Sequence, residues 1–234
     1  YFLMIKTTTD INEIIVFASM WNMDGLILMG FCEANYEKLR NQMRISFVVY
    51  DGYFDKSSKF VNLVIDHYDG GYKAGEYFKK LGHKKALCIS DNYICMDKER
   101  IDGFCKAFAP GETVIWQIPN TKKERVQFYR DKFLELSMLG ITGVFAVSDY
   151  YALDFMQFLQ GRGVRIPKDL QIIGMDDSIA SRESIPALTT IHQDADLRAK
   201  TAIECIEDMR EGRDFGTRIV LPVKLIKRES TGKL

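Results

Sequence analysis

The chain has 234 residues, 47% hydrophobic and 27% charged, which is enough to bury a full core in one large domain or two small ones. It carries 32 basic and 32 acidic residues, so there is no basic excess with which this segment by itself would bind nucleic acid. The balance favours an uncharged ligand or another protein surface as partner. No apolar run is long enough to span a bilayer, so no membrane partner is expected.

Cysteine and histidine usage indicates a reducing compartment and no metal site. An odd number of scattered cysteines without a Cys-x-x-Cys pair is explained most simply by buried free thiols in the cytoplasm. These are Cys32, Cys88, Cys95, Cys105 and Cys205. The three histidines are not paired at metal-ligand spacing, so we predict no metal, and no motif for another cofactor is present.

Strands alternate with helices along the whole chain. In chain order, strands are predicted over 1–5, 26–30, 45–50, 60–65, 86–89, 114–118, 143–147, 172–175 and 188–191, with a last pair in 219–226 that Pro222 interrupts. Helices are predicted over 11–21, 33–43, 69–81 (Asp69 as N-cap, Gly82 as stop), 97–108, 123–139, 149–159 and 196–210. The strands are continuous apolar runs, which is typical of a parallel sheet covered on both faces. The fold class is therefore α/β.

The most informative stretch runs from Gln171 to Gln193. Its apolar strand stops at paired carboxylates, Asp176 and Asp177, and open α/β sheets bind ligands just outside the carboxyl ends of their strands. A lone aspartate in this position could equally cap a turn. Four strand ends would face such a cleft: Asp51, Ser90, Ser148-Asp149 and Asp176.

Six segments in order resemble the effector domain of the lactose-repressor/galactose-repressor (LacI/GalR) family. They are GHKKALCIS (82–90), Glu99 to Phe104, VFAVSDYYAL (144–153), IPKDLQIIGMDD (166–177), IPALTTIHQD (185–194) and LPVKLIKREST (221–231). The resemblance covers almost the whole chain. It implies two doubly wound, parallel-sheet subdomains of periplasmic-binding-protein type, joined by three crossovers.

Mapped onto this sequence, the resemblance divides the chain into an N-terminal subdomain of 1–65 plus 194–216 and a C-terminal one of 66–193 plus 217–234. A helix-turn-helix headpiece should precede them, and it is absent, as are the first strand and helix of the N-terminal subdomain. The chain opens at Tyr1, without an initiator Met, inside the strand-like run YFLMI. We therefore expect a truncated or incompletely recorded N-terminus.

The resemblance also suggests which residues hydrogen-bond the ligand: Asp51, Arg100, Ser148 and Asp176. Carboxylates accept pairs of hydroxyl hydrogens and a guanidinium donates in fixed geometry, which suits a sugar. Arg100 could instead pair with Glu99 or Asp97 on its own helix. Ser148 stands where the family usually has Asn and lacks the amide donor and acceptor.

Other residues of the stretch have structural alternatives, and aromatic rings offer a further type of contact. Asp177 could cap the loop, and Asp149 is more often a helix N-cap. Sugar sites often stack an aromatic ring on the apolar face of the sugar. The candidates are Tyr53, Tyr93, Trp116 and Tyr150, of which Trp116 lies inside a strand pattern that favours core packing.

The sequence therefore predicts the ligand-binding and dimerisation domain of a cytoplasmic bacterial transcriptional regulator, with repressor as the first choice. A small sugar-like effector would bind between the subdomains of a homodimer and change operator affinity through the absent headpiece. The alternative is a soluble periplasmic-type sugar-binding protein, which the five unpaired cysteines and the Arg-Glu-Ser-Thr ending disfavour. Catalysis is not expected, because adjacent carboxylates point to opposite faces of a strand and no catalytic motif is present.

Overall fold

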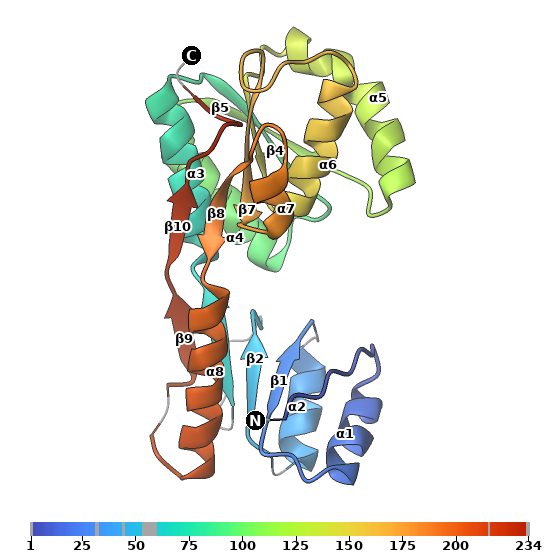
Figure 1. Ribbon diagram of the computed structural model, residues 1–234, viewed down its shortest axis with the longest axis vertical. Coiled ribbons are helices and arrows are strands. Elements are labelled where there is room, and N and C mark those ends of the chain that lie inside the picture. Colours follow the sequence, from blue (N-terminus) through green and yellow to red (C-terminus); the bar gives the residue numbers. More distant parts are fainter. Residues whose placement is uncertain (1, 31–32, 44, 53–59, 215, 233–234) are drawn as a thin grey trace. The chain divides into compact units, whose positions relative to one another are not determined.

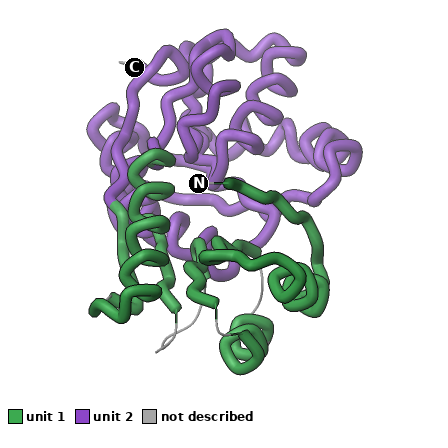
Figure 2. Tube along the Cα trace, turned by 60° about the horizontal axis from the view of Figure 1, so that its bottom comes forward, with its two compact units in different colours: residues 1–65, 194–221 green, residues 66–193, 222–234 purple. Residues whose placement is uncertain are grey.

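The protein is described by a computed structural model that covers residues 2–30, 33–43, 45–52, 60–214 and 216–232 (Figure 1). It divides into two compact units, drawn in different colours in Figure 2. Unit 1 holds residues 1–65 and 194–221, and unit 2 holds 66–193 and 222–234. The chain thus passes from one unit to the other after Ile65, Gln193 and Leu221. Within the described ranges, no helix has the length and apolar content to cross a membrane.

Unit 1 contains a parallel sheet in the order β1-β2-β3-β9. Its strands are β1 (Leu26–Met29), β2 (Phe47–Tyr50), β3 (Val61–Ile65) and β9 (Arg218–Leu221). Its helices are α1 (Ile11–Met20), α2 (Glu33–Gln42) and α8 (Ala195–Arg210), of which α8 packs on β2 and β3. On the other side, Ile14 of α1 and Leu39 of α2 pack with Phe47 of the sheet in one buried cluster.

Unit 2 contains a larger sheet in the order β10-β8-β7-β6-β4-β5, parallel except at β10. Its strands are β4 (Lys85–Ser90), β5 (Glu112–Gln117), β6 (Gly143–Ala146), β7 (Gln171–Asp176), β8 (Thr189–Gln193) and β10 (Val223–Ile226). Its helices are α3 (His67–Leu81), α4 (Cys95–Phe108), α5 (Lys122–Met138), α6 (Asp149–Gln160) and α7 (Ile179–Glu183). The predicted α/β class with parallel sheets is confirmed.

Helices cover both faces of the unit 2 sheet, which explains the unbroken apolar strands. Val144 of β6 packs in one cluster with Tyr129 of α5 and Phe155 of α6. The next residue, Phe145, stacks on Phe104 of α4 on the opposite face, with ring centroids 5.2 Å apart. Both faces of each central strand are therefore buried, as parallel sheets require.

Two local expectations were wrong. Residues 2–5 form no strand, and Phe2, Leu3 and Ile5 are exposed, because an extended segment becomes a strand only beside a hydrogen-bonding neighbour and β1 is the last strand on that side of the described sheet. Helix α3 begins two residues before the predicted N-cap. Its N-cap is Asp66, whose carboxylate accepts from the backbone N–H of Asp69 over 2.8 Å.

The last predicted strand pair is divided between the units. β9 hydrogen-bonds to β3 in unit 1, whereas β10, beyond Pro222, hydrogen-bonds to β8 in unit 2. The boundary between the units therefore follows Leu221, five residues after the predicted position at 216, because residues 218–221 are fixed by their pairing with β3.

Helices α3 and α4 touch backbone to backbone, and glycines make the contact possible. A Cβ added at Gly71 would lie 1.7 Å from the carbonyl oxygen of Arg100, and one added at Gly103 would lie 2.1 Å from that of Tyr68. Both carbonyls belong to the backbone of a helix and cannot move aside as a flexible side chain could. Gly71 of α3 thus provides a packing surface that fixes where Arg100 lies.

We expect Gly71→Ala to lower the free energy of unfolding by about 2–3 kcal/mol or more, because overpacking against a backbone forces the two helices apart. Gly161→Ala is the matched control. At Gly161 φ is −63° and an added Cβ meets only carbonyls at 3.4 Å or beyond, so Ala should leave stability unchanged or raise it by about 0.4–1 kcal/mol. Urea unfolding curves measure both, and equal stabilities of the two variants would contradict the close contact.

Candidate functional site

The carboxyl ends of neighbouring strands bring polar side chains to one edge of the unit 2 sheet. Strands β4, β6 and β7 lie next to one another and run parallel. Ser90 ends β4, Ser148 follows β6, and Asp176 ends β7. Three of the four strand ends that the sequence indicated therefore share the edge at which open α/β sheets bind ligands.

Arg100 of α4 reaches the same edge, where hydrogen bonds fix its guanidinium. Its Nε donates to Nδ1 of His67 over 3.1 Å, and its Nη1 donates to the carbonyl oxygen of Val147, the residue before Ser148, over 2.7 Å. Nη1 also lies 3.6 Å from Oδ1 of Asp97. Arg100 therefore pairs with Asp97 on its own helix, as anticipated, and also lies beside the strand ends.

Asp176 occupies a strained and poorly compensated position at the same edge. Its φ is +135°, a region that residues other than glycine rarely adopt. Oδ1 accepts from the Gln193 side-chain amide over 2.6 Å, and Oδ2 accepts from the backbone N–H of Asp149 over 3.3 Å. Burial raises the pKa of Asp176 to about 6, despite the opposing influence of Arg100. A carboxylate perturbed in this way is typical of functional sites.

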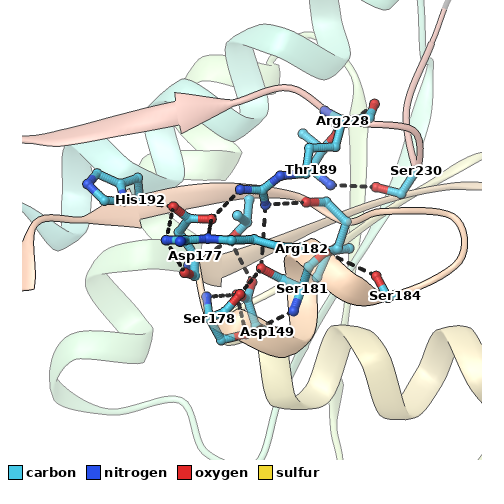
Figure 3. A network of polar contacts seen from close by, with 12 residues as sticks. Asp149, Asp177, Ser178, Ser181, Arg182, Ser184, Thr189, His192, Arg228 and Ser230 are labelled. Carbon is cyan, nitrogen blue, oxygen red and sulfur yellow. Dashed lines mark hydrogen bonds and ion pairs between the residues drawn. The ribbon is translucent and has the colours of Figure 1, made fainter.

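The neighbouring Asp177 has a structural role instead (Figure 3). Its carboxylate binds Arg182 over 2.9 Å and Nδ1 of His192 over 2.8 Å, and it also binds Arg228. Burial alone would raise the pKa of Asp177, but hydrogen bonds from these three partners lower it. Arg228 in addition donates to the carbonyl oxygen of Leu188 over 2.8 Å. Asp177 therefore joins the end of β7 to α7, β8 and the C-terminal segment.

Asp149 is also structural, although not as the predicted cap. Ser148 is the N-cap of α6, since its Oγ accepts from the backbone N–H of Tyr151. The carboxylate of the buried Asp149 accepts from the backbone N–H and the Oγ of Ser178, over 2.8 and 3.0 Å, and from Oγ1 of Thr190 over 2.5 Å. Asp149 thereby ties α6 to the loop after β7, and the ligand contact of Ser148 stays a prediction.

The structure adds residues to the site that the sequence did not single out. Asp97 lies in the first turn of α4 and accepts from Oγ of Ser90 over 2.6 Å, and burial raises its pKa. The spacing of three residues between Asp97 and Arg100 signalled a shared helix face. No local signal marked His67 or Gln193, because their partners lie on distant segments of the chain.

The predicted aromatic contacts fall in different places. Trp116 is in the core, edge-on to Phe155. The hydroxyl of Tyr93 hydrogen-bonds to Oδ1 of Asp102 over 2.5 Å. The hydroxyl of Tyr150 accepts from the fully buried Arg125 over 2.8 Å. Tyr53 lies outside the described residues.

Tyr150 and Asp176 line one groove between α6 and the segment around α7. The groove has a volume of about 570 Å³, and its polar lining includes Lys122, Asp154 and Gln157. Asp51, by contrast, belongs to unit 1, where it follows β2 with a φ of +49° and its carboxylate pairs with Arg198 over 2.7 Å. The described residues contain no group of three or more His, Cys, Asp or Glu side chains placed to hold a metal ion.

Asp176→Asn should stabilise the unliganded protein at pH 7.5. The folded-state pKa of Asp176 is about 6 and its ordinary value is 3.8. Between these values the unfolded chain has released a proton that the folded chain keeps, so stability falls as pH rises through this window. Asn removes that loss, and we expect a gain of about 1–3 kcal/mol at pH 7.5 that disappears by about pH 4.

Asp177→Asn serves as the control and should act in the opposite direction. The lowered pKa of Asp177 contributes stability above its ordinary value of 3.8, and this contribution is lost as pH falls through the folded-state pKa. The variant should therefore be less stable than the original protein at pH 7.5. Thermal and urea unfolding across the pH range measures both effects, and a loss of stability in both variants would contradict the assignment of Asp176.

Comparisons with known proteins identify similar domains. The sequence profile of the periplasmic binding protein-like domain matches residues 76–231. The HTH-type transcriptional repressor PurR of Vibrio cholerae is 28% identical over 222 residues, which cover 90% of this chain and 65% of that protein. The HTH-type transcriptional regulator DegA of Bacillus subtilis is 32% identical over 176 residues, covering 74% of this chain and 52% of that protein. The chain thus spans just under two thirds of the length of the Vibrio relative.

Among solved structures, a LacI family transcriptional regulator from Enterococcus faecium with bound ribose has a TM-score of 0.80 and 26% identity, covering 96% of this chain and 85% of that one. The similar proteins are named as transcriptional regulators, which favours a regulatory domain over a periplasmic transport protein. The chain belongs to the periplasmic-binding-protein-like domain family, as an effector-binding domain of the LacI/GalR type.

Proposed function

We propose that the whole protein is a cytoplasmic transcriptional repressor and that this chain is the part that binds a small, sugar-like effector. The observation that carries the proposal is the placement of a fixed guanidinium, Arg100, beside the buried carboxylate of Asp176 at the carboxyl edge of a parallel sheet. Hydroxyl groups donate to carboxylates and accept from a guanidinium, so both can bind the same sugar. We retain Ser148 and Asp51 as further predicted contacts.

Operator binding would use a helix-turn-helix segment outside this chain. The chain itself has equal numbers of acidic and basic residues, so an electrostatic DNA-binding surface is not expected within it. The effector changes operator affinity only to the extent that it binds one conformation of the domain more tightly than another. We propose binding without turnover, because the similar proteins are named as transcriptional repressors and regulators.

We also propose a homodimer that uses the surface formed by α6, α7 and the residues just after α7. Three large apolar or aromatic side chains there are exposed: Tyr150 at 59%, Ile179 at 71% and Ile185 at 85%. Adjacent exposed apolar groups of this kind mark protein interfaces more often than isolated ones do. A two-fold dimer would also match a palindromic operator.

A thermal-shift screen of the 234-residue chain against pentoses, hexoses, sugar phosphates and purines tests the effector proposal. A ligand at about one hundred times its dissociation constant should add roughly 2.7 kcal/mol to stability. Arg100→Ala should abolish this gain. Arg210→Ala, which removes an arginine from an exposed ion pair with Asp24, should retain it. A ligand that stabilises the Arg100→Ala variant as much as the original protein would overturn the site.

Sedimentation velocity tests the dimer. Ile179→Glu together with Ile185→Glu should give a monomer, because two buried charges facing their symmetry copies are repelled and desolvated. Leu134→Glu is the control, since Leu134 is a similarly exposed (69%) apolar residue on α5. A dimer that survives the double substitution would show that another surface is used.

A further inference from the structure

Asp176 differs from the buried carboxylates of Asp177 and Asp154 in how its charge is compensated. Asp177 is bound by Arg182, Arg228 and His192, and Asp154 is bound by Arg125 over 2.8 Å. No described Lys, Arg or His forms an ion pair with Asp176, whose oxygens accept from an amide side chain and a backbone N–H. Its hydrogen bonds therefore come from neutral donors, and the nearby Arg100 offsets only part of the effect of burial on its pKa.

Asp97 is the second carboxylate at this edge, and its one ion-pair partner among the described residues is Arg100, whose charge also acts on Asp176. Its side chain is 15% exposed, and Oδ2 accepts from the neutral hydroxyl of Ser90. Arg100 lies 3.6 Å away, beyond hydrogen-bonding distance, and its Nε and Nη1 already donate to His67 and Val147. Burial raises the pKa of Asp97 as it raises that of Asp176, and in both cases the opposing influence of Arg100 is the smaller one.

The charges at this edge therefore sum to a negative value. Arg100 lies near both Asp97 and Asp176, and the nearby Asp149 adds a third carboxylate, whose oxygens accept from Ser178 and Thr190. A phosphate or carboxylate on a ligand would meet two carboxylates that share one guanidinium, in a partly buried place where charges are weakly screened. A ligand ammonium would instead supply the missing cation, with hydrogen-bond donors for both carboxylates.

We propose, resting on the effector-binding function above, that the effector is an amine-bearing sugar or polyol and that Asp97 is the residue that selects it by contacting the ammonium group. Arg100 and Asp176 then hold the hydroxyl groups. Anionic sugars, such as sugar phosphates and sugar acids, are discriminated against. The selectivity is electrostatic, so it weakens with added salt more than the binding of a neutral sugar does.

Matched ligands test the proposal in isothermal titration calorimetry at pH 7.5. The panel consists of hexoses and pentoses, each with its amino and phosphorylated derivative: for example D-glucose, D-glucosamine and D-glucose 6-phosphate. For the set that binds, the amino sugar should bind at least about tenfold tighter than its hydroxyl parent, the usual scale for a desolvated charge pair. The phosphate should bind more weakly than the parent.

Two variants identify the residue responsible. Asp97→Asn keeps the shape and an acceptor for Ser90 but removes the charge, so the preference for the amine over its hydroxyl parent should fall by about tenfold. Asp102→Asn lies on the same helix, where Asp102 already pairs with Lys98, and it should leave the preference unchanged. Both substitutions remove one negative charge, so Asp102→Asn separates the local effect of Asp97 from the change in net charge.

The outcomes separate this inference from the proposed function. Binding of a neutral or phosphorylated sugar with no preference for the amine overturns the inference and leaves the effector function intact. A preference for the amine that persists in Asp97→Asn overturns the role of Asp97. If no sugar of any class binds, the sugar-effector function fails and the inference fails with it.

Discussion

The contact between α3 and α4 is the constraint on which the unit 2 site depends. Two helices approach until the Cα of Gly71 lies against the Arg100 carbonyl and the Cα of Gly103 against that of Tyr68. Such an approach leaves almost no freedom in the position of either helix, since carbonyl groups in a helix cannot rotate away. His67, at the start of α3, and Arg100 are thereby brought within hydrogen-bonding distance. The guanidinium is held before any ligand arrives, which reduces the entropy lost on binding.

Two consecutive carboxylates at the end of β7 have opposite roles because their surroundings differ. Asp177 is enclosed by Arg182, Arg228 and His192 and joins four segments of unit 2 (Figure 3). Asp176 receives only an amide and a backbone N–H. One carboxylate therefore stabilises the fold and the other reduces its stability at neutral pH. Destabilised groups that persist beside well-compensated ones are typical of functional sites.

The structural role of Asp177 also explains how the C-terminal segment of the chain is held in place. Arg228 binds Asp177 and the Leu188 carbonyl, and Ser230 donates from Oγ to the carbonyl of Ile172 over 2.6 Å. The Arg-x-Ser/Thr pattern, which the sequence presents as a family motif, thus fastens the C-terminal segment to β7 and β8. It supports the strand that presents Asp176 and has no need to contact a ligand itself.

The α/β class followed from sequence, because continuous apolar runs such as Ile172 to Met175 are stable only in a sheet covered on both faces. The helix end at Gly82 followed as well, since capping is a local interaction. Residues 2–5 failed as a strand because apolar composition does not supply a hydrogen-bonding neighbour.

Within the site, sequence indicated Arg100 and Asp176 but could not separate Asp176 from Asp177. Both residues are adjacent, acidic and at the end of one strand. Which of them receives cations depends on Arg182, Arg228 and His192, and two of these lie more than ten residues away along the chain. The sequence by itself determined the order of the elements and the chemistry available at their ends. Only the tertiary structure decided which charges are compensated, because burial and ion pairing arise between segments that are distant in sequence.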